Sequence, residues 1–272
     1  MTLALTETAY AKINLALHVR ARRPDGYHEL ETIFAFAKDG DRLSGVLADG
    51  LSLAVSGPHA SSLEGEADNL VLRAARGLQA ATGIRHGAAL HLDKLLPVAA
   101  GLGGGSADAA AALRLLVKLW QIDRDDPAIM IVAGELGADV PACVQSESCF
   151  GSGRGDELIP LHDPDLPGMP LLLVNPGVAL MTGPVFAGWD GIDRGALDPA
   201  DWRNGRNDLT QPALALASGI RALLDQLAAQ PGAAFVRMSG SGATCFALFD
   251  SLSERDDAAR QFPFWHMPTV LR

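Results

Sequence analysis

The chain has 272 residues, of which 48% are hydrophobic, enough for a sizeable core in one large domain or two smaller ones. It carries 22 basic and 32 acidic side chains, and a net charge of −10 argues against nucleic acid or an anionic membrane as partner. The start of the chain lacks the basic and apolar regions of a signal peptide, and no apolar run reaches membrane-spanning length. We therefore expect a cytoplasmic protein that acts on a small molecule. Its oligomeric state stays open.

Strands are predicted in the N-terminal part of the chain. At 9–19 the sequence AYAKINLALHV alternates apolar with mostly polar residues, which is typical of a half-buried strand. This period of two places Lys12 and Asn14 side by side on one face. Further strands are expected at 30–36, 41–47 and 51–55, with the last two joined by a tight hairpin.

The middle of the chain predicts helices on either side of a strand. A helix is expected from about Asn69, with Asp68 as its cap and Gly83 as its stop. A strand follows at 87–97. The later helices are predicted at 106–120 and at 127–136, the second ended by Gly137.

Glycine, proline and aspartate accumulate at 150–168, which we interpret as a crossover between two domains, 1–155 and 156–272. Strands and helices are mixed in the sequence without strict βαβ alternation, which favours an α+β fold over a doubly wound sheet. Beyond the crossover we expect a strand at 170–177, helices within 208–230, two strands in 233–249 joined at a Gly-Ser-Gly turn, and a last helix at 253–262.

A glycine-rich loop precedes a run of alanines in LPVAAGLGGGSADAAAAL. Glycine is costly in regular structure and alanine is the best helix former, so this change indicates a loop built for close backbone approach, followed by a helix. No Gly-Lys pair is present, which excludes a Walker A loop, and Ser106 stands where a dinucleotide loop has its third glycine. The loop is then either a plain turn or an anion site made by amides at a helix start. In the second case Ser106 caps the helix or offers its hydroxyl to a magnesium-bound phosphate.

Three stretches resemble, in order, the motifs of the GHMP kinases, a family named for galactokinase and the homoserine, mevalonate and phosphomevalonate kinases. They are AYAKINLALHV, the glycine-rich loop and MSGSGATCFALF. The resemblance implies an α+β fold with a ribosomal-protein-S5-like N-terminal domain and a ferredoxin-like C-terminal domain, with ATP, Mg²⁺ and the substrate meeting in the cleft between them. The implied ATP-binding residues are Pro97, Val98, Ala99, Ala100, Gly101, Leu102, Gly103, Gly104, Gly105, Ser106 and Ala107, with Asn69 and Lys94 near the adenine.

Two further stretches, RRPDGYHELETIF and LGADVPACV, narrow the resemblance to family members that act on a cytidine diphosphate-linked polyol. These transfer the ATP γ-phosphate to a 2-hydroxyl of the methylerythritol group, in the non-mevalonate route to isoprenoid precursors. The resemblance implies that Asp139 is the base, that Lys12 is its charged partner and that Asn14 binds the polyol. It also implies that Tyr27, His28 and Phe186 grip the cytosine, with Thr182 nearby.

The sequence departs from the family pattern at Ala107, where a second serine is usual, and at Ala99 and Ala100, where glycine is common. No residue set is assigned as a metal site, because the only candidates are Ser106 and Glu135. Two alternatives stay open: another small-alcohol kinase of the family, and a non-catalytic nucleotide-binding protein on the same fold.

Overall fold

The computed structural model describes residues 4–63 and 69–272. The chain forms two compact units that interleave in the sequence. Unit 1 contains residues up to Ala11, 39–98 and 103–146, and unit 2 contains 12–38, 99–102 and 147–272. No single point in the sequence separates the two units. The predicted division after residue 155 stays a prediction.

The first two strands, β1 (Leu5–Arg22) and β2 (His28–Ala48), each contribute residues to both units. The strand predicted at 9–19 is confirmed as the centre of β1. The expectation that it is half-buried is wrong, because Lys12 and Asn14 are only 4% and 2% exposed. These polar side chains are tolerated inside the protein because other protein groups satisfy their hydrogen bonds.

Strand β4 (Gly87–Asp93) lies between β2 and β3 (Leu51–Ser56) in the sheet of unit 1. It pairs antiparallel with β2 and parallel with β3. The predicted hairpin between β2 and β3 is therefore wrong. Glycine at position 87 permits β4 to lie between β2 and β3, since a Cβ there would lie 2.3 Å from the carbonyl oxygen of Gly50 in the β2–β3 turn.

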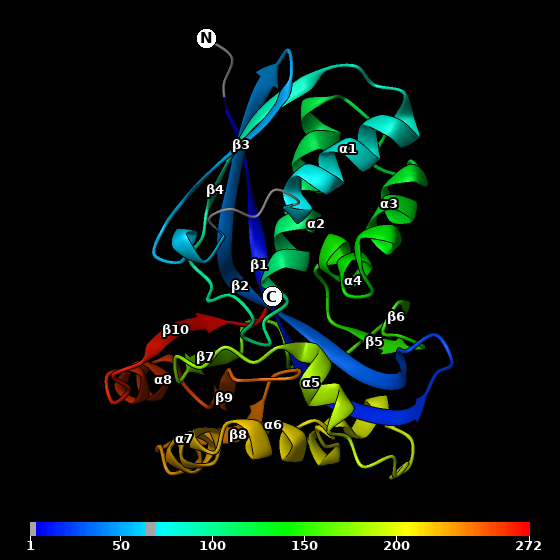
Figure 1. The fold of residues 1–272 in the computed structure, drawn as a ribbon. Helices are drawn as coiled ribbons and strands as arrows, with labels where there is room; N and C mark the ends of the chain where they lie inside the picture. The colour runs from blue at the N-terminus through cyan, green and yellow to red at the C-terminus, as the bar shows by residue number, and fades with distance from the viewer. Residues whose placement is uncertain (1–3, 64–68) are drawn as a thin grey trace. The chain divides into compact units, whose positions relative to one another are not determined.

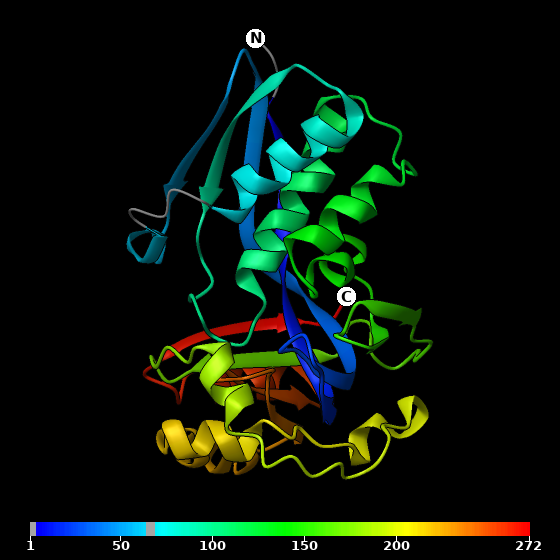
Figure 2. The ribbon, with the colours of Figure 1, turned by 45° about the vertical axis from the view of Figure 1, so that its right-hand side comes forward.

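Helices α1 (Leu70–Thr82), α2 (Gly104–Leu119), α3 (Ala128–Leu136) and α4 (Val140–Gln145) cover one face of the strands in unit 1 (Figures 1 and 2), and a short 3₁₀ helix spans Ala60–Leu63. The alanines at 109–112 are fully buried, so α2 lies close to its neighbours. Helix α1 is capped by Asn69, whose Oδ1 accepts from Val71 N–H, and it ends at Gly83 with φ of 72°. The predicted cap, Asp68, lies outside the described residues. Helix α4 was not predicted.

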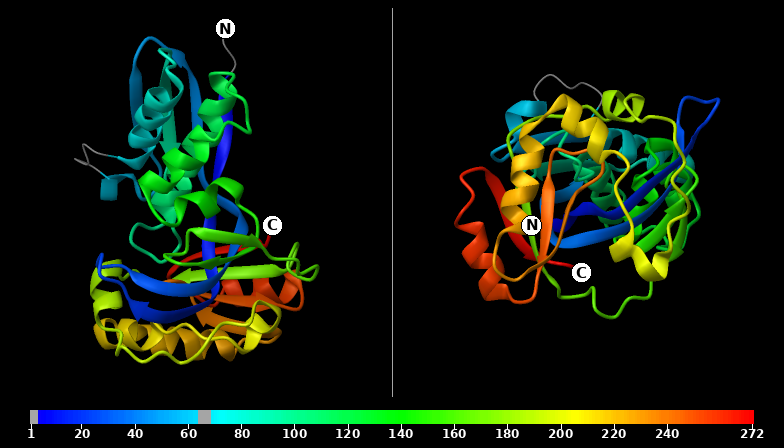
Figure 3. Two further views of the ribbon diagram at one scale, coloured as in Figure 1. Left: turned by 90° about the vertical axis from the view of Figure 1, so that its right-hand side faces the viewer. Right: turned by 90° about the horizontal axis from the view of Figure 1, so that it is seen from below.

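Unit 2 contains an antiparallel sheet of order β10-β7-β9-β8, with helices α7 (Gly219–Ala228) and α8 (Leu252–Ala259) packed on one face (Figure 3). The strands are β7 (Pro170–Asn175), β8 (Ala233–Met238), β9 (Cys245–Phe249) and β10 (Trp265–Val270). Residues Leu172, Val174, Ile220 and Leu223 contribute to its core. Strand β10 was not predicted, since Pro268 interrupts its pattern.

A hairpin of β5 (Cys149–Ser152) and β6 (Glu157–Pro160) extends β2 within unit 2. It occupies part of the segment that the sequence predicted as a crossover. Unit 2 also contains α5 (Thr182–Ala187), α6 (Thr210–Leu216) and a 3₁₀ segment at Pro199–Asn204. Across the described ranges, no helix combines the length and apolarity needed to cross a membrane.

Candidate functional site

The first half of the glycine-rich loop is fixed by its carbonyl groups. Each carbonyl of residues 99–102 accepts one hydrogen bond within unit 2. The donors, in order, are the N–H groups of Leu180 and Thr244, the hydroxyl of Ser239 and the N–H of Lys12. Because C=O and N–H point in opposite directions across a trans peptide, the amides of residues 100–103 face away from these donors. Loop amides that are held in place and not used by these donors are suited to binding phosphate oxygens.

Two loop residues have positive φ angles. Gly101 has φ of 76°, and a Cβ there would lie 2.4 Å from the carbonyl oxygen of Ser239. Ala99 has φ of 51°, in the region that favours glycine. One of the two alanines that stand where glycine is common in the family is thus in a strained backbone conformation.

The second half of the loop begins helix α2. Gly103 is the N-cap residue, with φ of 61° and no side-chain cap. The helix starts two residues earlier than predicted, so Ser106 lies in its first turn and the predicted capping role is wrong. The first-turn amides are therefore available to an anion, and the predicted contact of the Ser106 hydroxyl stays a prediction.

Beneath the start of α2, Lys94 is the centre of a buried ion cluster. Its Nζ lies 2.6 Å from Oδ2 of Asp41 and 2.6 Å from Oδ2 of Asp108. Burial by itself lowers the pKa of the Lys94 amine. The negative charges of Asp108 and Asp41 together have the larger effect, so the pKa of the amine is raised. Burial also raises the pKa of Asp108 to about 7, against the opposing effect of Lys94. Oδ1 of Asp41 accepts from the N–H groups of Leu95 and Leu96, which ties the cluster to the loop entry.

The two residues predicted near the adenine have structural partners in unit 1. Lys94 is held by the two carboxylates, and Asn69 caps α1 through its Oδ1, 2.9 Å from Val71 N. A Cβ on Gly104 would lie 3.1 Å from Lys94 Nζ, which places this amine at the start of α2. Contact of either residue with adenine stays a prediction.

On β1, Lys12 and Asn14 are joined as the period of two predicted. Lys12 Nζ donates to Asn14 Oδ1 at 2.9 Å, and Asn14 Nδ2 donates to Thr32 Oγ1 at 2.8 Å. The backbone N–H of Asn14 donates to Ser239 Oγ at 3.3 Å. An ammonium group has only donors, so it fixes the amide orientation of Asn14 and is itself held in one place.

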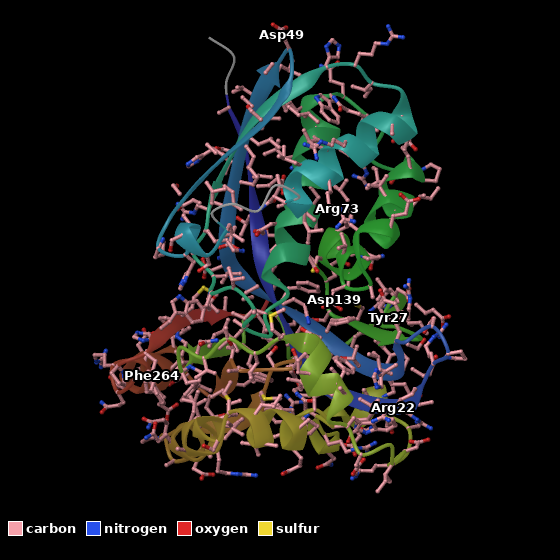
Figure 4. The ribbon with its side chains drawn as sticks, viewed as in Figure 1. Arg22, Tyr27, Asp49, Arg73, Asp139 and Phe264 are labelled. Atoms are coloured by element: carbon pink, nitrogen blue, oxygen red, sulfur yellow. The ribbon has the colours of Figure 1, made fainter. Side chains whose placement is uncertain are left out.

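Asp139 stands at the N-cap position of α4 and is labelled close to this helix in Figure 4. The side chain is half-buried and makes no capping hydrogen bond to the helix. Pro141 stands within the first turn of the helix, where its missing N–H costs nothing. Asp139 belongs to unit 1 and Lys12 to unit 2, so their predicted pairing stays a prediction. Glu135 is exposed.

The residues predicted to grip a cytosine lie in unit 2. The rings of His28 and Phe186 are 4.9 Å apart between centroids, and His28 is edge-on to Trp189 at 5.8 Å. Burial and the Arg22 charge lower the pKa of His28, which favours the neutral form of its ring. Among the described residues, its buried Nε2 has no hydrogen-bond partner, and such an atom is costly unless a ligand satisfies it.

The remaining predicted substrate residues flank this aromatic group. Thr182 begins α5, and its Oγ1 lies 3.2 Å from Ser241 Oγ in the Gly-Ser-Gly turn. Tyr27 is 53% exposed in the β1–β2 turn. Within the described part of the chain no ring contact joins Tyr27 to Phe186, and their stacking on a shared base stays a prediction.

Sequence reasoning missed several residues that support these groups. Arg22 Nη2 donates to the carbonyl of Trp189 at 2.6 Å, which connects β1 to the segment after α5. Thr32 and Ser239 hold Asn14, and Arg154 lies over Tyr27. All except Trp189 lie inside or beside stretches already singled out, but only contacts between distant residues identify their roles.

In the described parts of the chain, no group of three or more His, Cys, Asp or Glu side chains is arranged to hold a metal ion. A magnesium ion that bridges nucleotide phosphates needs only one or two protein oxygens, since it keeps several waters. The hydroxyl of Ser106, in the uncapped first turn of α2, fits that requirement.

Comparison with known proteins identifies the family. The description "GHMP kinases N terminal domain" matches residues 69–147, and "GHMP kinases C terminal" matches 192–265. The 4-diphosphocytidyl-2-C-methyl-D-erythritol kinase of Rhizorhabdus wittichii is 55% identical, over 98% of this chain and 94% of the relative. That of Novosphingobium aromaticivorans is 51% identical, over 99% and 94%.

Solved structures agree with these relatives. A crystal structure of 4-(cytidine 5'-diphospho)-2C-methyl-D-erythritol kinase superposes with a TM-score of 0.82 at 33% identity, over 98% of this chain and 99% of that one. The Methanococcus jannaschii mevalonate kinase, at 9% identity and a TM-score of 0.70 over 100% and 99% of the two chains, shows the shared fold alone. The predicted two-domain α+β fold is confirmed. The chain belongs to the GHMP kinase family, and within it to the 4-diphosphocytidyl-2-C-methyl-D-erythritol kinases.

Proposed function

We propose that this chain transfers the γ-phosphate of ATP to the 2-hydroxyl of 4-diphosphocytidyl-2-C-methyl-D-erythritol, a step in the non-mevalonate route to isoprenoid precursors. Membership of a kinase family supports ATP as phosphate donor. The observation that carries the choice of acceptor is the buried, unpartnered Nε2 of His28 beside the ring of Phe186. A polar atom next to an aromatic face is what recognition of a pyrimidine base requires.

In this proposal the glycine-rich loop, residues 97–107, binds the phosphates of ATP. Its first half offers the amides of residues 100–103 from a backbone fixed by four carbonyl hydrogen bonds. Its second half offers the uncapped N-terminus of α2, whose dipole favours negative charge. Donors that are already in place stabilise charge on the transferring phosphate without reorganisation at the moment of reaction.

Mg²⁺, when bound, neutralises charge on the phosphates. We assign the hydroxyl of Ser106 as its protein ligand. The Ser106 hydroxyl would supply one protein oxygen, which is within the one or two that magnesium usually takes from protein in phosphoryl transfer.

The acceptor hydroxyl loses a proton during the transfer, and we assign Asp139 as the group that takes it. Lys12 is assigned as the cation that stabilises the negative charge developing at the hydroxyl oxygen or the γ-phosphate. The hydrogen bond to Asn14 holds the Lys12 ammonium in place, and burial strengthens its field. Asn14 is also assigned to the polyol.

The cytosine is assigned to Tyr27, His28 and Phe186, with Thr182 at the edge of the same site. The neutral His28 ring offers one donor and one acceptor nitrogen, and cytosine presents both kinds of group on its edge. Nothing in this proposal needs nucleic acid or a membrane as partner. We place the reaction in the cytoplasm, and the net charge of −10 is in keeping with that.

One assay tests the proposal against its alternatives. The purified protein is supplied with ATP and Mg²⁺ and, in parallel reactions, with 4-diphosphocytidyl-2-C-methyl-D-erythritol, mevalonate or homoserine. We expect ATP consumption with the first acceptor only. Turnover of mevalonate or homoserine would instead indicate another small-alcohol kinase, and ATP binding without any turnover would indicate a nucleotide-binding protein.

A further inference from the structure

We propose that Arg154 is a positioning residue of the pyrimidine site, stacked on one face of Tyr27 so that the other face of the ring is set to receive the base. This inference rests on the proposed function. It adds a residue from the β5–β6 turn to a site otherwise built from the β1–β2 turn, β2 and α5. The Arg154 guanidinium lies over the Tyr27 ring, with Cζ 5.1 Å from its centroid.

Tyr27, labelled in Figure 4, needs such a support for its ring because the residue is 53% exposed. Its backbone is already fixed: Tyr27 O accepts from Arg23 N–H at 2.8 Å, and Tyr27 N–H donates to Asp25 Oδ1 at 3.0 Å. A fixed backbone still leaves the side chain a choice of rotamers. A contact on one ring face removes part of that freedom before the base binds, so less entropy is lost on binding.

Arg154 is itself held in one orientation. Its Nε and Nη2 donate to Oδ2 of Asp156 at 2.9 and 2.5 Å, and its backbone N–H donates to Oδ1 of the same residue at 3.2 Å. The turn is closed by a hydrogen bond from Gly155 N–H to Ser152 O at 2.9 Å. Strand β5, which leads into this turn, is paired with β2, the strand that follows Tyr27. The β1–β2 turn and the β5–β6 turn thus connect strands of one sheet.

The charge distribution also favours stacking over direct binding of a phosphate. Two of the three guanidinium nitrogens of Arg154 already donate to Asp156, which neutralises the local charge. The flat face of the guanidinium stays suited to an aromatic ring, because cation–π contacts use the face and not the N–H edge. A phosphate-binding arginine would instead direct its N–H fork at the ligand.

The test is a double-mutant cycle measured with ATP and the cytidyl substrate. Arg154→Leu should raise the KM of the cytidyl substrate by about two- to fivefold, the range of an exposed cation–π contact, and leave kcat unchanged. Arg154→Lys keeps the charge without the planar face and should recover only part of the affinity. In a Tyr27→Ala background, Arg154→Leu should have no further effect. Arg124→Leu, at an exposed arginine beside Asp125, is the control and should match the parent.

The outcomes separate the roles. An unchanged KM in Arg154→Leu overturns the inference, and so does a KM increase that persists undiminished in the Tyr27→Ala background, since that would indicate direct contact with the substrate. A fall in kcat in Arg154→Leu at unchanged KM also overturns it. If the parent does not turn over the cytidyl substrate, it is the proposed function that fails, and a second measurement then tests the stacking alone.

That measurement uses the small number of tyrosines. The chain has two, Tyr10 and Tyr27, so ring signals of protein with labelled tyrosine are assigned by one Tyr10→Phe variant. Arg154→Leu should shift the Tyr27 ring signals and leave those of Tyr10 in place. Added cytidine 5'-diphosphate should shift the Tyr27 signals in the parent and require a higher concentration in Arg154→Leu. Tyr27 signals that are identical in the two proteins would overturn the inference.

Discussion

Adding a single methyl group at Gly101 tests whether the first half of the phosphate loop is fixed as described. In Gly101→Ala the new Cβ would lie 2.4 Å from the carbonyl oxygen of Ser239 and 2.8 Å from that of Gly242. Both atoms belong to backbone, so neither moves without shifting the Gly-Ser-Gly turn. The residue also has φ of 76°, which an alanine adopts only with strain.

The expected loss of stability follows from these two effects. An L-residue in the left-handed region costs about 1–2 kcal/mol, and overpacking of a fitted contact costs about 1–3 kcal/mol more. We therefore expect Gly101→Ala to lower the free energy of unfolding by about 2–5 kcal/mol. A shifted turn would also displace the loop amides, so the KM for ATP should increase.

The assay is urea unfolding followed by circular dichroism, with the KM for ATP measured on the folded fraction. Gly104→Ala is the matched control, because its Cβ would meet only the end of the Lys94 side chain, at 3.1 Å, and glycine within a helix is less favourable than alanine. Gly104→Ala should change stability by less than about 1 kcal/mol. Equal effects of the two substitutions, or a loss below 1 kcal/mol at Gly101, would refute the reasoning.

Three further predictions concern the proton acceptor Asp139, the stacking of Tyr27 on the cytosine, and the pH dependence of the free energy of unfolding. Asp139→Asn removes the proposed proton acceptor and should reduce kcat by on the order of a hundredfold. The affinity for ATP, measured by calorimetry, should change little, and near-normal turnover would exclude Asp139 as the proton acceptor. Tyr27→Ala should raise the KM of the cytidyl substrate roughly ten- to a hundredfold, since base stacking is worth about 1–3 kcal/mol, whereas Tyr27→Phe should change it much less. Burial and Arg206 lower the pKa of His18, whose ring accepts from Arg206 N–H and contacts Gly195 O, so the unfolded chain binds a proton there before the folded protein does. The contribution of His18 to the free energy of unfolding should fall as pH decreases below about 6.5, whereas Asp108, whose pKa is raised to about 7, contributes with the opposite sign in the same range. The difference in urea midpoint between the parent and His18→Gln isolates His18, and a difference that does not change between pH 7.5 and 5.5 would contradict the prediction.

Local pattern was enough to predict much of the fold. The alternation in β1 placed Lys12 and Asn14 together, and their hydrogen bond bears this out. Gly83 and Gly137 mark the ends of α1 and α3, as predicted, because a helix end depends on the backbone preferences of a few adjacent residues. The change from glycines to alanines indicated a loop followed by a helix for the same reason.

Pairing order and burial depended on residues far apart in the chain. The strands β2 and β3 are neighbours in sequence, yet β4 lies between them, since Gly87 can approach the turn where a larger residue cannot. Lys12 reads as an exposed strand lysine, and only Asn14 and the surrounding protein make its burial acceptable. Strand β10 escaped prediction because Pro268 interrupts its own pattern, and it is held in the sheet by pairing with β7.

The sequence by itself determined the family, the two turns rich in glycine and the residue types that phosphoryl transfer needs, because these are encoded in short stretches whose order and spacing are specific. Only the tertiary structure decided how those residues are held: Lys94 between Asp41 and Asp108, Ser239 on Gly101, and Arg154 over Tyr27. The physical reason is that a hydrogen bond, an ion pair or a ring contact depends on positions in space, and residues separated by 14 to 138 positions meet only after the whole chain has folded.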